Sequence, residues 1–371
     1  MASLGRKIAG TLLVLVVAAV VTVGFTLSHE AACGPAPALA GGAVPMKAVV
    51  RRCYGPPDVL TLENIEKPVA ADNQVLVKVR AAAVNPVDWH YMRAKPYLMR
   101  IETGLGTPKN VRLGIDFAGT VEAVGKDVTR FKPGDEVFGG KFGALAEYLA
   151  VAEDGSIVAK PANLTFEQAG SVHVAALTAL QALRDRGKIQ PGQKVLINGA
   201  SGGVGTFAVQ IAKSFGAEVS GVCSTRNVEM VRSLGADHVF DYTKEDFAQS
   251  GQQYDVILDN VGNRNLSDIR RVLAPTGKYI LIGGGGPDEG PWIGVFVGAI
   301  KTWVVSHFVE QEMGMFVSGA STVDLETLSD LMEAGTVTPV IDRTYPLTEA
   351  ADAMRYLEEG HARGKVVVTF D

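Results

Sequence analysis

The sequence predicts an α/β protein in which a β-rich domain is joined to a doubly wound parallel sheet, with an apolar helix at the N-terminus. Two patterns along the 371 residues support this. Up to about residue 172, short apolar runs are separated by Gly, Pro and Asp turns, and after it strands alternate with helices. Such alternation is typical of βαβ units, whose crossovers are almost always right-handed.

The first 45 residues differ in composition from the rest of the chain. An uncharged run extends from Ile8 to Leu27, and about 18 or more apolar residues are enough to cross a bilayer. Ala38-Leu39-Ala40 resembles a signal cleavage site, so a cleaved export signal is the alternative. Residues 1–45 are therefore predicted to be a membrane anchor or signal segment followed by an Ala/Gly/Pro-rich linker.

This run predicts a membrane-anchored protein whose folded body faces the cytoplasm. Arg6 and Lys7 favour the opposite orientation by the positive-inside rule, so the orientation stays open. Export after signal cleavage and a cytoplasmic chain that starts at Met46 are the alternatives. The body from Met46 onward is expected to have its own core and to need nothing from the preceding residues.

Three domain segments are predicted in the body. The β-rich catalytic domain spans residues 46–172, the parallel-sheet domain spans 173–321, and residues 322–371 return to the catalytic domain. Strands of the parallel sheet are predicted at 194–197, 218–223, 238–242, 254–258 and 278–282, with helices at 204–215, 227–234 and 266–273. The returning segment is predicted to contain helices at 324–333 and 347–358 and strands at 337–341 and 365–370.

Charge and cysteine content exclude several classes of protein. The net charge of −5 argues against nucleic acid as a partner, because phosphate binding needs a basic face. The three cysteines are too few for a disulfide framework, and no pair has the C-x-x-C spacing of a zinc site. We therefore expect a core held by packing alone.

The strongest motif is a glycine-rich loop between a predicted strand and a predicted helix. It reads Gly199-Ala200-Ser201-Gly202-Gly203-Val204-Gly205. Such a loop allows a tight turn, close approach of a pyrophosphate to the backbone, and close packing of the helix on the sheet. The free N–H groups at the helix start attract the anion. The sequence therefore predicts a dinucleotide site.

The end of the next strand predicts which dinucleotide binds. An NAD site has Asp or Glu there to bind the ribose 2′-hydroxyl. This chain has Ser224, Thr225 and Arg226 instead. Two hydroxyls and a guanidinium suit a 2′-phosphate, so NADPH is the predicted cofactor.

With these motifs in order, the chain resembles the medium-chain dehydrogenase/reductases, within the zinc-independent quinone oxidoreductase (zeta-crystallin-like) branch. The resemblance covers Met46 to Asp371 and is carried by motifs at 46–49, 54–55, 85–88, 114–119, 175–179, 199–205, 234–237, 259–262 and 364–368. It implies a GroES-like domain, a Rossmann domain and an active site between them.

The resemblance also implies roles for individual residues. Asn85 and Asp88 would lie beside the nicotinamide, and Tyr97 would face the substrate. The remaining residues of the predicted cofactor site are Thr178 near the carboxamide, Tyr242 near the 2′-phosphate, Asn260, Val261 and Gly262 under the nicotinamide ribose, and Gly283 and Lys365.

No metal site is predicted. Zinc-dependent relatives have a Cys where Asn85 stands, and His90 and His173 have no thiolate partners, which makes them surface or core residues. Zinc catalysis needs three protein ligands.

The predicted function is transfer of a hydride from NADPH to a quinone or other conjugated carbonyl without zinc. Asn85 and Tyr97 are the predicted hydrogen-bond donors to the substrate oxygen, and the cofactor carries the chemistry. Reduction of enoyl thioesters or other activated alkenes is one alternative. A membrane-tethered NADPH sensor without turnover is another. Whether the chain forms a homodimer stays open.

Overall fold

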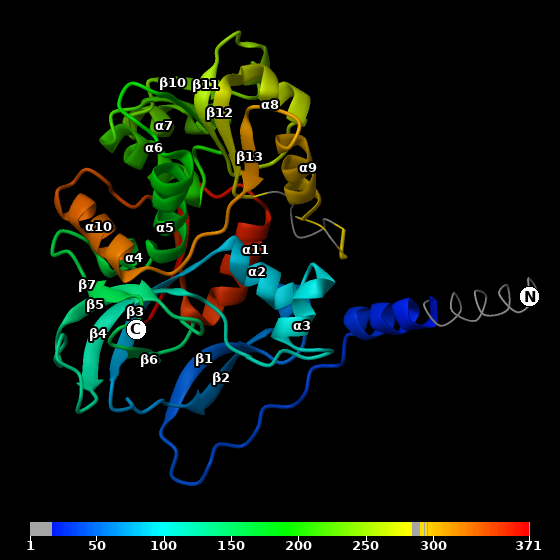
Figure 1. Cartoon of the computed structure of the whole chain (residues 1–371). Coiled ribbons are helices and arrows are strands. Elements are labelled where there is room, and N and C mark those ends of the chain that lie inside the picture. The colour runs from blue at the N-terminus through cyan, green and yellow to red at the C-terminus, as the bar shows by residue number, and fades with distance from the viewer. Residues whose placement is uncertain (1–16, 284–289, 293, 295, 371) are drawn as a thin grey trace, which may run out of the picture.

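A computed structural model describes residues 17–283, 290–292, 294 and 296–370. Two sheets define two domains, which meet along helices α2 (Pro86–Arg93), α5 (His173–Gln181) and α11 (Ala350–Glu358) (Figure 1). The predicted combination of a GroES-like β-rich domain with a Rossmann-type parallel sheet is confirmed.

The Rossmann-type sheet has six parallel strands in the order β10-β9-β8-β11-β12-β13. They are β8 (Lys194–Asn198), β9 (Glu218–Cys223), β10 (His238–Asp241), β11 (Tyr254–Asp259), β12 (Leu273–Leu281) and β13 (Glu312–Met315). The strand order reverses between β8 and β11. Ligands of such sheets bind at the carboxyl ends of the strands at this switch point.

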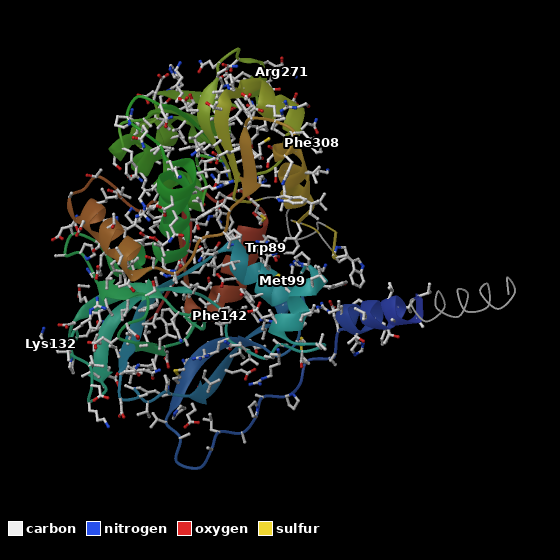
Figure 2. The ribbon with its side chains drawn as sticks, in the orientation of Figure 1. Trp89, Met99, Lys132, Phe142, Arg271 and Phe308 are labelled. Carbon is white, nitrogen blue, oxygen red and sulfur yellow. A yellow bond between two sulfur atoms is a disulfide. The ribbon has the colours of Figure 1, made fainter. Side chains whose placement is uncertain are left out.

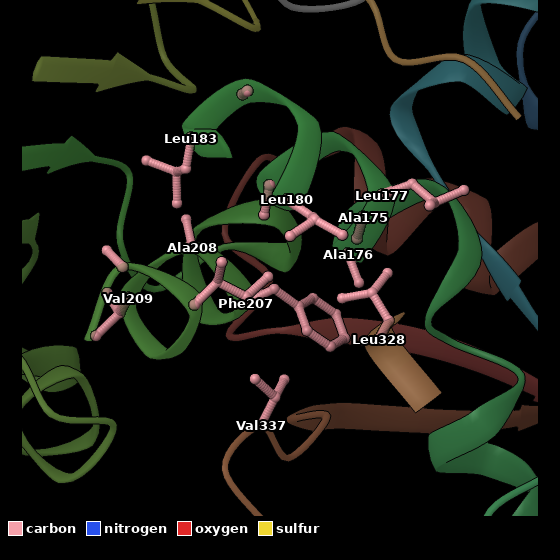
Figure 3. Close-up of a cluster of buried hydrophobic side chains, with 14 of the residues drawn as sticks. Ala175, Ala176, Leu177, Leu180, Leu183, Phe207, Ala208, Val209, Leu328 and Val337 are labelled. Atoms are coloured by element: carbon pink, nitrogen blue, oxygen red, sulfur yellow. The ribbon is translucent and has the colours of Figure 1, made fainter. Parts of the chain in front are cut away.

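Helices pack on both faces of this sheet and supply much of its core. They include α6 (Gly203–Ser214), α7 (Val228–Ser233), α8 (Leu266–Val272), α9 (Phe296–Ser306) and α10 (Thr322–Glu333). Phe207 of α6 lies among Leu180 of α5, Leu328 of α10 and Val337, all within one buried cluster (Figure 3). This packing fixes the start of α6 against the end of β8, where the glycine loop lies.

The catalytic-domain sheet has seven strands, and its C-terminal strand is an interior one. The path is β14-β15-β3-β4-β5-β7, with β6 on β3. These are β3 (Gln74–Val84), β4 (Asp116–Val124), β5 (Glu136–Gly140), β6 (Tyr148–Ala152), β7 (Ile157–Ala159), β14 (Ile341–Pro346) and β15 (Lys365–Thr369), while β1 (Pro45–Arg51) and β2 (Leu60–Glu66) form a separate pair. Strand β15 pairs with β14 on one side and with β3 on the other.

Some elements differ from the sequence prediction. The strand predicted from Val337 begins only at Ile341, because Thr338 exchanges two hydrogen bonds with the Gln210 side chain and Val337 is buried beside α10. Short helices also interrupt the β-rich region: α2, α3 (Arg100–Thr103) and α4 (Phe166–Ala169). Helix α9 and strand β13 lie in a stretch that has no clear sequence pattern.

The prediction of a membrane anchor is wrong for the part of the chain that the structure describes. There, no helix combines the length and the apolar character needed to cross a bilayer. The described part of the predicted run, residues 17–28, is helical. Leu27 at the end of this helix is 5% exposed because it packs on the protein. The first part of the predicted apolar run, up to residue 16, lies outside the described residues.

The expectation of a core held by packing alone also needs correction. Cys33 and Cys53 form a disulfide with Cα atoms 4.6 Å apart, across 20 residues of sequence. It joins the segment before β1 to the loop after β1. Cys223 is free and buried in β9.

Candidate active site and cofactor cleft

The glycine loop makes a tight turn between β8 and α6. Gly199 adopts φ +76°, and a Cβ on Gly205 would stand 2.1 Å from the Gly199 carbonyl oxygen, so both positions need glycine. Gly202 precedes α6, and no side chain caps the helix there. The first N–H groups of this 12-residue helix are therefore free for an anion.

Asn227 links the glycine loop to the end of β9. Its Nδ2 donates to Ser201 Oγ at 3.0 Å and to Ser224 Oγ at 3.2 Å, and its Oδ1 is buried without a partner. Ser201 and Ser224 were predicted cofactor residues, and Asn227 was not. Its amide holds the two hydroxyls on one side of the crevice.

Arg226 and Thr225, the other residues of the predicted 2′-phosphate site, contact different neighbours. The exposed Arg226 donates from Nη2 to the His361 carbonyl oxygen at 2.6 Å, which ties it to the segment before β15. Thr225 donates to Asp241 Oδ2 at 2.6 Å. Hydrogen bonds from Thr225 and Thr243 hold the pKa of the Asp241 carboxyl well below its usual range. Tyr242 is 55% exposed.

Asp259, at the end of β11, organises the loop predicted to lie under the nicotinamide ribose. Its Oδ1 accepts from Val261 N at 3.0 Å and Gly262 N at 2.8 Å, and its Oδ2 accepts from Tyr279 Oη at 2.9 Å. Burial beside this carboxylate raises the pKa of the Tyr279 hydroxyl. The loop is thus held rigidly by a fully buried acid.

Asn260 in the same loop offers an unused acceptor. Its Nδ2 donates to the Asn198 carbonyl oxygen at 3.0 Å, while its Oδ1 is buried without a hydrogen-bond partner. A Cβ on Gly283 would stand 2.4 Å from the Asn260 carbonyl oxygen, so this crossing of the two strand ends also needs glycine. A buried acceptor without a donor fits a bound group that carries hydroxyls, such as a ribose.

Asn85, Asp116 and Lys365 form a buried polar cluster between the two domains. Lys365 donates from Nζ to Asn85 Oδ1 and lies 3.2 Å from Asp116 Oδ2. Asn85 donates from Nδ2 to the same Asp116 oxygen at 3.1 Å, and Asp116 Oδ1 accepts from Val174 N at 2.9 Å. A Cβ on Gly203 would stand 3.1 Å from Lys365 Cδ. The Lys365 stem thus lies against the glycine loop, while its ammonium group contacts Asn85 and Asp116.

Asp88 lies beside this cluster at the start of α2. It is fully buried and accepts from Asn85 N at 2.8 Å and from Gly114 N at 3.1 Å. Burial outweighs these hydrogen bonds and raises the pKa of the Asp88 carboxyl to about 7. Asp88 and Asn85 form the capping box of α2, which orients both residues.

Thr178 and Tyr97, the other predicted site residues, contact different neighbours. Thr178 Oγ1 contacts the Val174 carbonyl oxygen at 2.6 Å and Ser318 Oγ at 2.9 Å. The Tyr97 ring packs edge-on against Trp292 at 5.2 Å and under the Arg100 guanidinium at 4.4 Å.

The two histidines examined as metal ligands are part of the interior packing. His173 is 7% exposed and its Nε2 lies 2.8 Å from Ser156 Oγ, and His90 Nδ1 lies 2.9 Å from the Lys95 carbonyl oxygen. Burial lowers the pKa of both imidazoles. Within residues 17–283, 290–292, 294 and 296–370, no three His, Cys, Asp or Glu side chains are grouped so that they could hold a metal ion.

Comparison with known proteins shows which family has this architecture. Residues 71–162 match the family described as "Alcohol dehydrogenase GroES-like domain", and residues 234–368 match "Zinc-binding dehydrogenase". The chain is 36% identical over 359 residues to mouse "NAD(P)H oxidoreductase RTN4IP1, mitochondrial", which covers 87% of this chain and 89% of the relative. The chain belongs to the medium-chain dehydrogenase/reductase superfamily. It is an NAD(P)H oxidoreductase of that superfamily.

Two further similarities concern the branch of the superfamily to which the chain is related. The chain is 36% identical over 338 residues to tomato "2-methylene-furan-3-one reductase", covering 87% of this chain and 79% of the relative. The solved structure of the quinone oxidoreductase from Coxiella burnetii matches with a TM-score of 0.76 and 31% identity, covering 88% of this chain and 99% of that one. The predicted quinone oxidoreductase branch is thus supported by both sequence and fold.

Several residues that build the site were not predicted from the sequence as site residues. Asp116, Asp259 and Asn227 are 0%, 0% and 4% exposed. Asp116 starts β4 and Asp259 ends β11, so a polar residue at the end of a buried strand was the signal available. Asn227 carries no such signal, because its role depends on the fold of the glycine loop.

Proposed function

We propose that this protein transfers a hydride from NADPH to a quinone or an enone without a metal ion. The buried Lys365–Asn85–Asp116 cluster carries the proposal, because it places a positive charge between the glycine loop and the catalytic domain. A preorganised charge stabilises an oxyanion that develops in a water-poor site. Bound NADPH would supply the hydride.

The chain's own groups would act on the substrate oxygen. Both hydrogens of the Asn85 amide have acceptors, Asp116 Oδ2 at 3.1 Å and the Ala83 carbonyl oxygen at 3.4 Å. We therefore assign the stabilisation of negative charge to Lys365, with Asn85 holding its ammonium group, and hydrogen-bond donation to Tyr97. The substrate gains one hydride and one proton, and the proton comes from solvent.

The proposed cofactor site uses the glycine loop, the β9 end and the Asp259 loop. The free N–H groups of α6 would bind the pyrophosphate, and Asn260 Oδ1 would accept a hydrogen bond from the nicotinamide ribose. The preference for NADPH rests on Ser224 and Arg226 at the end of β9 and on the absence of an acid at those positions.

The test is oxidation of NADPH, followed by its absorbance, with a panel of quinones, enones and a saturated ketone. The proposal predicts turnover of the conjugated substrates, no turnover of the saturated ketone, and unchanged rates after prolonged dialysis against a chelator. Zinc at one ion per chain together with activity that the chelator abolishes would overturn the metal-free mechanism. NADPH binding without turnover of any panel member would favour a cofactor-binding sensor.

Reduction of an activated alkene is the second candidate function. The tomato relative is named for reduction of a 2-methylene-furan-3-one, in which the alkene is conjugated to a ketone. The same buried charge would stabilise the enolate that forms when hydride adds to the alkene. Deuterium from labelled NADPH in a carbon–deuterium bond of an enone product would identify this reaction, whereas a quinone yields a hydroquinone.

A further inference from the structure

The segment before the first strand is built into the catalytic domain beside Tyr97. Arg100, the first residue of α3, has a side chain with 0% exposure. Its Nη1 donates to the carbonyl oxygens of Leu27 and His29, both at 3.0 Å. Its Nη2 lies 2.7 Å from Glu30 Oε1. A buried guanidinium thus finds three acceptors in residues 27–30.

Backbone and covalent contacts continue this docking. Glu30 forms a parallel β-bridge with Gly106, and Ala31 N donates to the Gly106 carbonyl oxygen at 3.2 Å. The Cys33–Cys53 disulfide follows directly. Residues 27–33 are therefore fixed along the loop that follows α3.

Arg100 also holds two aromatic rings. Its guanidinium carbon lies 4.4 Å from the centre of the Tyr97 ring and 4.9 Å from that of the Tyr54 ring. A guanidinium held between rings and acceptors has one orientation, because its planar fork matches both. Arg100 thereby couples the position of Tyr97 to the position of the N-terminal segment.

The other side of Tyr97 meets the same segment through Trp292. Tyr97 N donates to the Pro291 carbonyl oxygen at 2.7 Å, and the Tyr97 ring packs edge-on against Trp292. A Cβ on Gly24 would stand 3.6 Å from Trp292. Figure 2 places Met99, two residues from Tyr97, on the side of the molecule from which the N-terminal helix extends. The end of that helix thus flanks Tyr97 on both sides, through Arg100 and through Trp292.

We propose that residues 24–33 are a strap that positions Tyr97 for the substrate, with Arg100 as the positioning residue that binds the strap. This rests on the proposed role of Tyr97 in binding a quinone or enone. The strap bounds the substrate side and not the NADPH side, because it contacts Arg100 and Gly106 and is joined through its disulfide to Cys53. Arg100 touches neither reactant.

The test compares Arg100→Met with the wild type and with Arg232→Met, a matched control whose exposed guanidinium pairs with Glu229. Amide hydrogen exchange is measured across residues 97–107, because exchange reports local opening. NADPH affinity is measured by fluorescence titration, and KM and kcat are measured with a quinone or an enone.

The strap predicts faster exchange at 97–107 in Arg100→Met, and a KM raised by about tenfold, since small displacements of a positioning group are costly. NADPH affinity should stay within about twofold, and Arg232→Met should match the wild type. Unchanged exchange at 97–107 in folded Arg100→Met would overturn the strap. Faster exchange with an unchanged KM would support docking of the segment and overturn the role of Tyr97 in the substrate site.

A second variant keeps the test decisive if Arg100→Met does not fold. Glu30→Ala leaves the guanidinium and its backbone acceptors in place and removes only the carboxylate, which is 45% exposed. If the strap acts as proposed, Glu30→Ala changes the exchange at 97–107 and the KM in the same direction as Arg100→Met, but by less. Exchange at 97–107 equal to that of the wild type in Glu30→Ala, and also in a chain that starts at Gly34, would overturn the proposal.

Discussion

Lys365 Nζ lies 3.2 Å from Asp116 Oδ2, and the two side chains are 3% and 0% exposed. Breaking such a buried pair by removing one partner leaves an uncompensated charge, which costs about 3–5 kcal/mol. The ammonium group comes from the first residue of β15 and the carboxylate from the first residue of β4, and both strands belong to the catalytic-domain sheet.

Lys365→Met should therefore lower both stability and turnover. We expect a loss of about 3–5 kcal/mol in the free energy of unfolding, measured with urea, because Asp116 is left buried beside an apolar side chain. Lys126→Met is the matched control, since the Lys126–Asp72 pair is 71% and 67% exposed. It should cost less than about 1 kcal/mol. Equal losses in both variants would contradict a special role for Lys365.

Asp88 should make stability depend on pH. Its folded pKa of about 7 lies above the ordinary value of 3.8, so the folded state holds a proton that the unfolded state has already released. The free energy of unfolding should then fall as pH rises from about 4 to about 7 and level off above that range.

Asp88→Asn removes this titration and should flatten that part of the curve. Urea unfolding at several pH values measures the effect, and Asp330→Asn on the exposed face of α10 is the control. Parallel curves for wild type and Asp88→Asn would show that Asp88 keeps an ordinary pKa in the folded protein.

Arg226→Glu should weaken NADPH binding much more than NADH binding. It replaces a cation with an anion at the proposed 2′-phosphate site, and a charge-assisted contact is worth about 1.5–3 kcal/mol, or tenfold and more in affinity. Titration of the two cofactors measures the ratio, with Arg232→Glu as the control. Equal weakening of both cofactors would mean that Arg226 acts through its hydrogen bond to His361 instead.

A chain that starts at Met46 should be less stable than the full chain. The sequence suggested that the body needs nothing from residues 1–45, but Arg100 would lose its acceptors in Leu27, His29 and Glu30. The guanidinium keeps its hydrogen bond from Nε to the Ala94 carbonyl oxygen, so we expect a loss of about 1–3 kcal/mol in the free energy of unfolding.

Arg100→Met in that shortened chain should recover part of the loss, because a neutral side chain needs no acceptor. Urea unfolding of the four chains forms a double cycle. Additive effects of shortening and substitution would show that Arg100 and the N-terminal segment are independent.

The sequence was informative where a local rule acts and uninformative where distant segments meet. The glycine loop was predictable because Gly199 is required by its own φ of +76° and Gly205 by its close approach to the Gly199 carbonyl oxygen. The pairing of Lys365 with Asp116 spans 249 residues, and that of Arg100 with Glu30 spans 70. Neither leaves a local pattern.

The N-terminal run was misinterpreted for a related reason. Leu27, near the end of the described helix, is 5% exposed, and its carbonyl oxygen accepts a hydrogen bond from the buried Arg100 side chain, 73 residues away. Helix α9 was missed because its exposed residues are also apolar, among them Ile300 and Trp303, so no amphipathic period marks it.

The place of β15 has a consequence for the order in which the protein matures. This strand, the last of the chain, lies between β14 and β3, and it pairs with β3 at residues 81–84. During synthesis the Rossmann-type sheet is therefore made in full before β15. The edge of β3 at residues 81–84 stays unpaired until residues 366–369 have been made. An unpaired edge of this kind recruits other strands, so the chain is exposed to aggregation until β15 pairs with β3. A chaperone that protects this chain would therefore be needed at the catalytic domain. A chain that stops before residue 365 would lack β15 and leave the edge of β3 unpaired.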